Sequence, residues 1–341
     1  MKYRRKETVV GTLKILGIAL LLLTLLSFIL SRQPWKTIAA MSLGPFSNLY
    51  NFGNLLNAAV PMVLGGLGIL IALKASLINL GGEGQIYLSA LVTTQVGLCL
   101  HGWGPLGAVI ALLAGGLCGG LMAALSGLLK AIWKTNELIT SYLISSCMIN
   151  LGNYLVTGPL HDPQTNLLST RQIAASMQLH QILPPSGLST ALIYAVCLTF
   201  IVNAYLFKTK GGYELRMVGI NEDFARYGGI GSHGRIVWAL FLSGFFHGLA
   251  GGMLVLGTYH ATLREFSSGI GWSSFSVALI ASGNPIAVLP ASFFFAWIQS
   301  GATIAMQQSD VTSDLAQIAQ GLVFLLISST VLLKGRKNTW N

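Results

Sequence analysis

The chain has 341 residues, of which 53% are hydrophobic and only 9% charged, and its mean hydropathy is +0.68. This composition excludes an ordinary soluble domain and predicts an all-α polytopic membrane protein. The formal net charge of +10 suggests a nucleic-acid partner as an alternative, but no basic stripe with interleaved aromatics occurs outside short loops. The four cysteines lie in apolar segments without metal-ligand spacing, so neither a disulfide framework nor a metal site is predicted.

Apolar runs follow one another along most of the chain. A transmembrane helix needs about 20 such residues, and the runs predict about ten crossings. They are placed near 9–30, 52–73, 85–100, 105–129, 138–157, 187–207, 236–258, 271–283, 285–306 and 312–333. The first run is long for a signal peptide, and the SRQPW that follows offers no small-residue cleavage site. Residues 1–51 are therefore interpreted as an uncleaved anchor helix with an external loop, ahead of a transmembrane domain over 52–334.

The basic residues gather on one side of this map. They precede the first run, fall in the loops near 130 and between 208 and 235, and close the chain. Of the 20 Lys and Arg residues, only Arg32, Lys36, Arg171 and Arg264 belong to the other side. Because cytoplasmic loops carry an excess of Lys and Arg, both termini are predicted to be cytoplasmic.

The stretch INLGGEGQI, residues 78–86, sets a carboxylate among glycines beside a long apolar run. An unpaired carboxylate at membrane depth costs at least about 2.5 kcal/mol, so Glu83 must face protein, water or backbone amides. The glycines permit an irregular turn, and nearby amide side chains can bond the freed backbone groups. Two interpretations stay open: the carboxylate pins a broken helix, or it contacts a polar substrate. The candidate pathway residues here are Asn79, Gly81, Gly82, Glu83, Gly84 and Gln85.

An internal repeat indicates a transporter. Crossings that start near 52, 85 and 138 recur near 236, 271 and 312, at an offset of about 175 to 185 residues. Each is displaced by an odd number of crossings, so the halves, about 52–157 and 236–333, are inverted relative to each other. Inverted repeats with matching Gly-interrupted helices are typical of a pathway at the repeat interface. The second interruption, FSSGIGWSSFSVALIASGNP, adds Trp272, Ser273 and Asn284 to the candidates.

Two polar segments separate the crossings. Residues 158–186 form the longest external segment, and residues 208–235 form the longest internal one. Within the latter, NEDFARYGGI predicts a short helix with an acidic first turn, two aromatics three residues apart and two glycines at its end. This loop is either a solvated connector or a docking element.

Four motifs together resemble the permease subunits of bacterial ABC importers for ribose, galactose and nucleosides. They are KASLINLGGEGQIYLSALV (74–92), GYELRMVGINEDFARYGGI (212–230), LSGFFHGLAGGMLVLG (242–257) and GWSSFSVALIASGNPIAVLPASFFFAWIQSGA (271–302). The similarity runs from about residue 50 to 330 and is strongest to purine-nucleoside permeases. In place of the alanines common in that family, this chain has Gly82 and Gly228.

The resemblance implies a non-catalytic subunit in the bacterial inner membrane, and the chain has no G-x-x-x-x-G-K-[ST] phosphate loop. ATP and magnesium would then bind a separate cytoplasmic ATPase, and this chain would bind no cofactor. The further expected partners are a second related permease, an extracytoplasmic substrate-binding protein and the lipid bilayer. The resemblance places the ATPase contact on 208–235, at Asn221, Glu222, Asp223, Phe224, Ala225, Arg226, Tyr227, Gly228 and Gly229.

Three matters stay open at this point. A stand-alone secondary transporter would need no ATPase and no partner subunits. A membrane-embedded enzyme is the third class, but no Ser-Gly pair is preceded by the Gly-x pattern of intramembrane serine proteases, and His-Glu-x-x-His is absent. The sequence also does not distinguish a nucleoside from a related sugar as substrate.

Overall fold

The computed structural model describes residues 31–312 continuously, and single positions on either side (17, 21, 24, 25, 27–29, 318, 321, 322 and 325). Within these residues the protein is built from helices, and only isolated β-bridges occur. The α-helices are α2 (Pro34–Leu43), α3 (Leu49–Lys74), α4 (Gly82–Cys99), α5 (Gly104–Trp133), α6 (Glu137–Thr157), α7 (Ala191–Lys208), α8 (Lys210–Ile220), α9 (Glu222–Tyr227), α10 (Ser232–Leu254), α11 (Ile270–Ile280) and α12 (Pro285–Gln308). Short 3-10 turns cover Gly44–Phe46, His101–Trp103 and Ala175–Met177, and a π-helical turn, Val255–Tyr259, extends α10.

The all-α membrane class predicted from composition is confirmed. Among the described residues, five helical segments are long and apolar enough to cross a membrane: Leu49–Lys74, His101–Trp133, Ala191–Lys208, Ser232–Tyr259 and Pro285–Gln308. Each predicted crossing between 52 and 306 corresponds to a helix. The predicted crossings 9–30 and 312–333 lie outside the described residues, apart from the single positions named above. The count of ten therefore stays a prediction.

The chain divides into two compact units, Met1–Ala59 with Phe293–Asn341, and Val60–Ser292. In the first unit, α2 packs directly on the second half of α12. The Gly301 backbone approaches Met41 so closely that a Cβ atom there would collide with the Met41 carbonyl, and the Trp297 indole donates to the Ser42 carbonyl at 3.0 Å. Beyond α12, Asp310 accepts hydrogen bonds from the Ser31 hydroxyl at 2.6 Å and the Arg32 amide at 2.7 Å.

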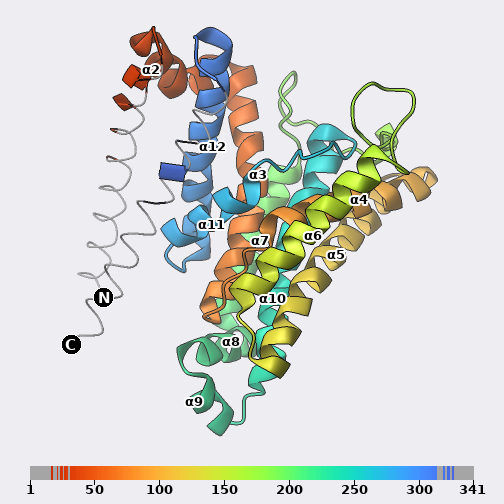
Figure 1. Ribbon diagram of the computed structural model, residues 1–341, viewed down its shortest axis with the longest axis vertical. Helices are drawn as coiled ribbons and strands as arrows, with labels where there is room; N and C mark the ends of the chain where they lie inside the picture. Colours follow the sequence, from red (N-terminus) through yellow and green to blue (C-terminus); the bar gives the residue numbers. More distant parts are fainter. Residues whose placement is uncertain are drawn as a thin grey trace. The chain divides into compact units, whose positions relative to one another are not determined.

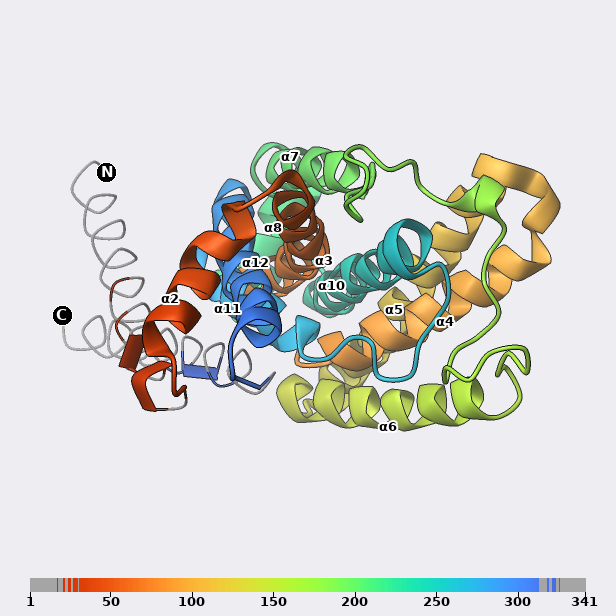
Figure 2. The ribbon, with the colours of Figure 1, turned by 90° about the horizontal axis from the view of Figure 1, so that it is seen from above.

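In the second unit, α4, α5 and α10 form a tightly packed core, with α6 and α7 on opposite sides of it (Figure 2). Small residues make this packing close. A Cβ atom on Gly244 of α10 would collide with the Gly119 carbonyl of α5, and one on Gly248 would lie 2.8 Å from the Gly116 Cα. Such approach leaves little freedom between α5 and α10, so they serve as the rigid part of this unit.

The two polar segments lie at opposite ends of the second unit (Figure 1). The segment that begins at residue 158, which is predicted to be external, is mostly irregular and continues to Thr190, so α7 begins a few residues later than predicted. It pairs with the chain after α10: the Ile173 amide donates to the His260 carbonyl and the Leu179 amide to the Leu256 carbonyl, both at 2.9 Å. At the other end, residues 208–235 are largely helical, because α8 and α9 occupy most of a segment that the sequence presents as a loop.

Candidate functional site

The Gly-rich stretch begins with an irregular break between α3 and α4. Ser76 takes a left-handed conformation with φ of 56°, and α4 resumes only at Gly82. Asn79 and Gln85 are both 1% exposed, and their amides pair with each other at 3.0 and 3.1 Å. Asn79 also accepts from the Gly81 amide at 2.9 Å and donates to the Ser243 hydroxyl of α10 at 2.9 Å. The prediction that amide side chains bond freed backbone groups is confirmed for Asn79, whereas the Gln85 side chain bonds that of Asn79.

Glu83 points from the first turn of α4 to the first turn of α11. Its carboxylate accepts the Gly271 backbone amide at 2.9 Å and also bonds the Ser267 hydroxyl. The first amides of a helix lack intrahelical partners and carry the positive end of the helix dipole. Gly269, with φ of 89°, precedes α11 in the left-handed conformation that turns these amides toward Glu83. The carboxylate thus caps a second helix, far away in sequence, as well as lying in the first turn of its own.

Gly82 lies where α10 and α11 approach α4 closely. A Cβ atom there would lie 2.9 Å from His247 Nε2 and 3.2 Å from the Gly271 Cα. His247 itself is fully buried on α10, where Nδ1 bonds the Ser243 carbonyl at 2.8 Å. The departure from the alanine common at this position therefore makes room for α11 and His247, in addition to loosening the backbone.

The structure brings together only some of the predicted pathway residues. Gly84 is buried and donates its amide to the Ser145 hydroxyl of α6 at 2.8 Å. Trp272 is 43% exposed and Ser273 buried, both in the first turn of α11 beside Glu83. Asn284 lies beyond the other end of α11, and the length of that helix separates it from Trp272 and Ser273 by about 17 Å. There it caps α12 by accepting the Ile286 amide at 3.1 Å. Contact of these residues with a substrate stays a prediction.

The predicted docking helix forms as its sequence indicates. Asn221 caps α9 by accepting the Phe224 amide at 2.9 Å, the acidic Glu222 and Asp223 occupy the first turn, and Gly229 ends the helix with φ of 80°. Ala225 faces inward at 1% exposed, whereas Phe224 is 69% and Tyr227 93% exposed. Two large rings thus stand in solvent on a helix whose opposite side is buried.

Glu222 ties α9 to the end of α5. It forms ion pairs with Arg226 at 3.1 Å and with Lys134 at 3.7 Å. Partial burial raises the pKa of this carboxyl, but a hydrogen bond with Ser232 and the charges of Lys134 and Arg226 outweigh it and hold the pKa below its usual range. Glu222 is therefore ionised at neutral pH, and its ion pairs are lost only as the pH falls through that lowered value.

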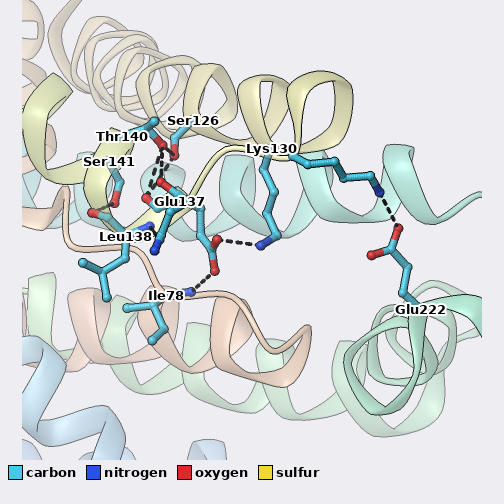
Figure 3. A network of polar contacts seen from close by, with 10 residues as sticks. Ile78, Ser126, Lys130, Glu137, Leu138, Thr140, Ser141 and Glu222 are labelled. Atoms are coloured by element: carbon cyan, nitrogen blue, oxygen red, sulfur yellow. Dashed lines mark hydrogen bonds and ion pairs between the residues drawn. The ribbon is translucent and has the colours of Figure 1, made fainter.

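A polar network continues from α5 into the break before α4 (Figure 3). Glu137, which is only 7% exposed at the start of α6, binds Lys130 of α5 at 2.6 Å and accepts the Ile78 amide at 3.4 Å. The Ser141 hydroxyl accepts the next free amide, that of Leu80, at 3.1 Å. On the α3 side, the Ser76 hydroxyl bonds the Gly219 carbonyl of α8 at 2.5 Å. The segment 208–235 is thus connected to the Gly-rich break by two routes. One runs through Ser76 after α3, and the other runs through Lys134 and Lys130 of α5 to Glu137 of α6.

Sequence reasoning missed this network. In the sequence, the positive-inside bias gives Lys130 a role in topology alone, and no motif points to Glu137 or Ser141. The available signal was a carboxylate directly after Asn136, at the start of a predicted crossing and seven residues beyond a lysine. Asn136 is indeed the N-cap of α6, accepting the Leu138 amide at 3.0 Å.

These features describe a helical protein of the polytopic membrane class, with an irregular break before α4 and a short helix, α9, that exposes two aromatic rings. The chain belongs to the family described as branched-chain amino acid transport system / permease component, which matches residues 51–328. It is therefore the non-catalytic membrane subunit of an ABC transporter, which removes the membrane-embedded enzyme and the stand-alone secondary transporter as alternatives.

Three relatives show which substrates are named for permeases similar to this chain. The chain is 34% identical to a probable riboflavin import permease protein of Treponema pallidum, over 88% of this chain and 80% of the relative. It is 29% identical to a guanosine ABC transporter permease protein of Bacillus subtilis, over 85% of this chain and 84% of the relative. It is also 29% identical to a glucose ABC transporter permease protein of Haloferax volcanii, over 96% and 87%. No solved structure matches the chain.

Proposed function

We propose that this permease carries a nucleoside across the bacterial inner membrane, into the cell, with ATP hydrolysed on a separate ATPase. The observation that carries the coupling part of the proposal is the α9 helix, whose Phe224 and Tyr227 rings stand in solvent while Ala225 holds the helix to the protein. Exposed aromatics on a fixed support are typical anchors of a protein interface. ATP and its magnesium bind the ATPase partner, and this chain needs no cofactor of its own.

The distribution of basic residues supports the proposed orientation of the chain in the membrane. The end of α5, which carries Lys130 and Lys134, lies toward α8 and α9, and the basic residues of 208–235 belong to that same end of the second unit (Figure 1). Arg171 and Arg264 belong to the segment 158–190 and to the chain that pairs with it. The positive-inside rule makes the α8–α9 end cytoplasmic and places both termini in the cytoplasm. The external segment 158–190 then faces the substrate-binding protein that delivers the substrate.

The coupling step follows from the contacts of the docking segment. When the ATPase moves α9, the ion pair between Glu222 and Lys134 transmits the motion to the end of α5. The hydrogen bond between α8 and Ser76 transmits it to the turn after α3. Both contacts lead to residues 78–84, whose amides are held by Glu137, Ser141 and Ser145. The displaced break carries Glu83 with it, and Glu83 holds the start of α11. A motion at the cytoplasmic end thereby changes how two short helices meet in the membrane.

A second permease completes the transporter in this proposal. A further guanosine permease protein of Bacillus subtilis is 25% identical to this chain over 71% of its length, so that bacterium has two such proteins similar to it. We infer a heterodimeric pore in which this chain supplies one half.

The substrate is tested by uptake in cells that express this permease with its ATPase, sister permease and binding protein. Labelled guanosine, riboflavin and glucose are offered separately, with leucine as the substrate class in the family's description. Guanosine uptake that requires this chain supports the proposal. Uptake of glucose or riboflavin without guanosine would assign the alternative substrate while leaving the permease function intact.

A further inference from the structure

A polar cavity in the first unit is not explained by the contacts described so far. It has a volume of about 260 Å³ and is lined by Tyr50, Asn51, Asn54, Ala58, Gln299, Ser300, Thr303, Ile304 and Gln307. These residues come from the N-terminal part of α3 and the C-terminal part of α12, both of which are apolar membrane-crossing helices. We propose that this cavity is a binding site for the transported molecule, of the class of neutral nucleosides.

The polar residues form a stripe on each helix. On α3, Tyr50 and Asn54 are four residues apart, and on α12, Gln299, Thr303 and Gln307 repeat the same spacing. Residues four apart lie on one face of a helix. Polar side chains in a membrane-crossing helix avoid lipid and face protein or a water-filled path, so two facing polar stripes mark such a path.

The cavity wall is held in place by hydrogen bonds to the turn that follows α2 and by one bond within α12. Asn51 donates to the Gly44 carbonyl at 3.2 Å and to the Ser47 hydroxyl at 3.0 Å, and Thr303 donates to the Gln299 carbonyl at 3.0 Å. Within the described part of the chain, the Gln299 and Gln307 amides make no hydrogen bond, so their donors and acceptors are available to a ligand. A fixed wall with free amides is suited to recognising a shape and a hydrogen-bond pattern.

The chemistry of the lining selects the ligand class. None of the lining residues is charged. A zwitterionic amino acid or a phosphorylated molecule would leave charge without a partner in a low-dielectric site, which is costly. Amide side chains instead pair with the donor and acceptor edges of purine bases, and the Tyr50 ring offers a face on which a base can stack. The volume is close to the lower end of the range of about 300–1,000 Å³ for small-molecule pockets, which suits one small ligand.

The position of the cavity agrees with delivery from outside. The other end of α3 is at Lys74, which the charge bias of the sequence assigns to the cytoplasmic side. The N-terminal part of α3 is therefore the extracytoplasmic part. This inference rests on the proposed function, since it assigns the place where the delivered nucleoside first contacts the permease.

The test is protection of single cysteines in the assembled transporter. The four native cysteines are replaced by alanine, and Thr303→Cys reports on the cavity, while Met306→Cys, on α12 outside the lining, is the matched control. Membranes are treated with a small impermeant thiol reagent, with and without guanosine or leucine. We expect guanosine to slow labelling of Thr303→Cys by about fivefold or more, as for a largely occupied site, and to leave Met306→Cys unchanged.

Transport by two further variants completes the test. Thr303→Val and Gln299→Leu are expected to raise the KM for guanosine by about five- to tenfold, the effect of one lost hydrogen bond, at unchanged membrane levels and ATPase co-purification. Asn203→Leu on α7, outside the cavity, is the control for loss of an amide. Unchanged labelling and KM in membranes that do take up guanosine would overturn the cavity assignment alone. Protection by leucine would overturn the neutral ligand class, and absence of guanosine uptake by the unmodified transporter would overturn the proposed function instead.

Discussion

Glu83 shows how a carboxylate is accommodated beside a long apolar helix. The sequence predicts that it must find protein, water or backbone amides, and it lies among glycines that permit this. The structure gives it the first amides of α11, with Gly271 at 2.9 Å. That partner is 188 residues away in sequence, and no local pattern identifies it. The need for a partner was thus predictable, while the identity of the partner depends on tertiary packing.

We expect Glu83→Leu to impair transport far more than Glu83→Gln. Glutamine keeps an oxygen that accepts the Gly271 amide, whereas leucine leaves buried amides unpaired at a cost of about 1–3 kcal/mol. The measurement is guanosine uptake normalised to the amount of permease in the membrane. Equal uptake by the wild type and a well-expressed leucine variant would show that the cap on α11 is dispensable.

Glu137 is a second buried carboxylate with a specific role. We expect Glu137→Ala to lower uptake at saturating guanosine, with little change in KM, because it frees the Ile78 amide and leaves Lys130 without its partner. Breaking a buried pair costs about 3–5 kcal/mol, and partial exposure of Lys130 reduces this to about 1–3 kcal/mol. Glu137→Gln, which can still accept from Ile78, should retain more activity.

The Lys130 and Glu137 variants also form a double-mutant cycle. If the two side chains act as a pair, the loss in Lys130→Ala with Glu137→Ala is smaller than the sum of the single losses. Strictly additive losses would contradict a shared role in holding the break.

Whole helices differ in how well the sequence predicts them. The crossings between 52 and 306 were predicted from apolar length, and α9 from its cap, acidic turn and glycines, because these signals are local. The sequence predicts that residues 210–220 belong to a loop, and this prediction is wrong because they form α8. Thr209 caps this helix by accepting the Gly212 amide at 3.1 Å. Three glycines and only modest apolar periodicity conceal that helix, whose stability comes from packing against the end of α3.

The docking role proposed for α9 predicts an uneven effect of its side chains. Phe224→Asp combined with Tyr227→Asp is expected to abolish both guanosine uptake and co-purification of the ATPase, since interface energy concentrates in large apolar anchors. Both rings are exposed in the permease itself, so the variant should still insert and fold.

Glu222→Ala is the matched change on the same helix. Its ion pairs lie at the protein surface and each contribute about 0–1 kcal/mol, so uptake should fall only slightly. Normal uptake by the double aspartate variant would mean that the ATPase docks elsewhere.

For the chain as a whole, charge bias predicts the orientation that the helices alone do not define. In a variant without native cysteines, Arg171→Cys is expected to react with an impermeant thiol reagent in intact cells, and Arg216→Cys only after the membrane is opened. Labelling of Arg216→Cys in intact cells would invert the predicted topology, and α9 would then lie on the side opposite to a cytoplasmic ATPase.

The central claim is that this chain is one of the membrane subunits of an ATP-driven nucleoside importer. Its most direct test is guanosine accumulation by proteoliposomes that contain this permease, its sister permease and the ATPase, with the binding protein supplied on the extracytoplasmic side. We predict accumulation against a gradient that requires ATP hydrolysis and is lost with Phe224→Asp and Tyr227→Asp. Guanosine accumulation by this permease alone, driven by an ion gradient and indifferent to ATP, would contradict the account.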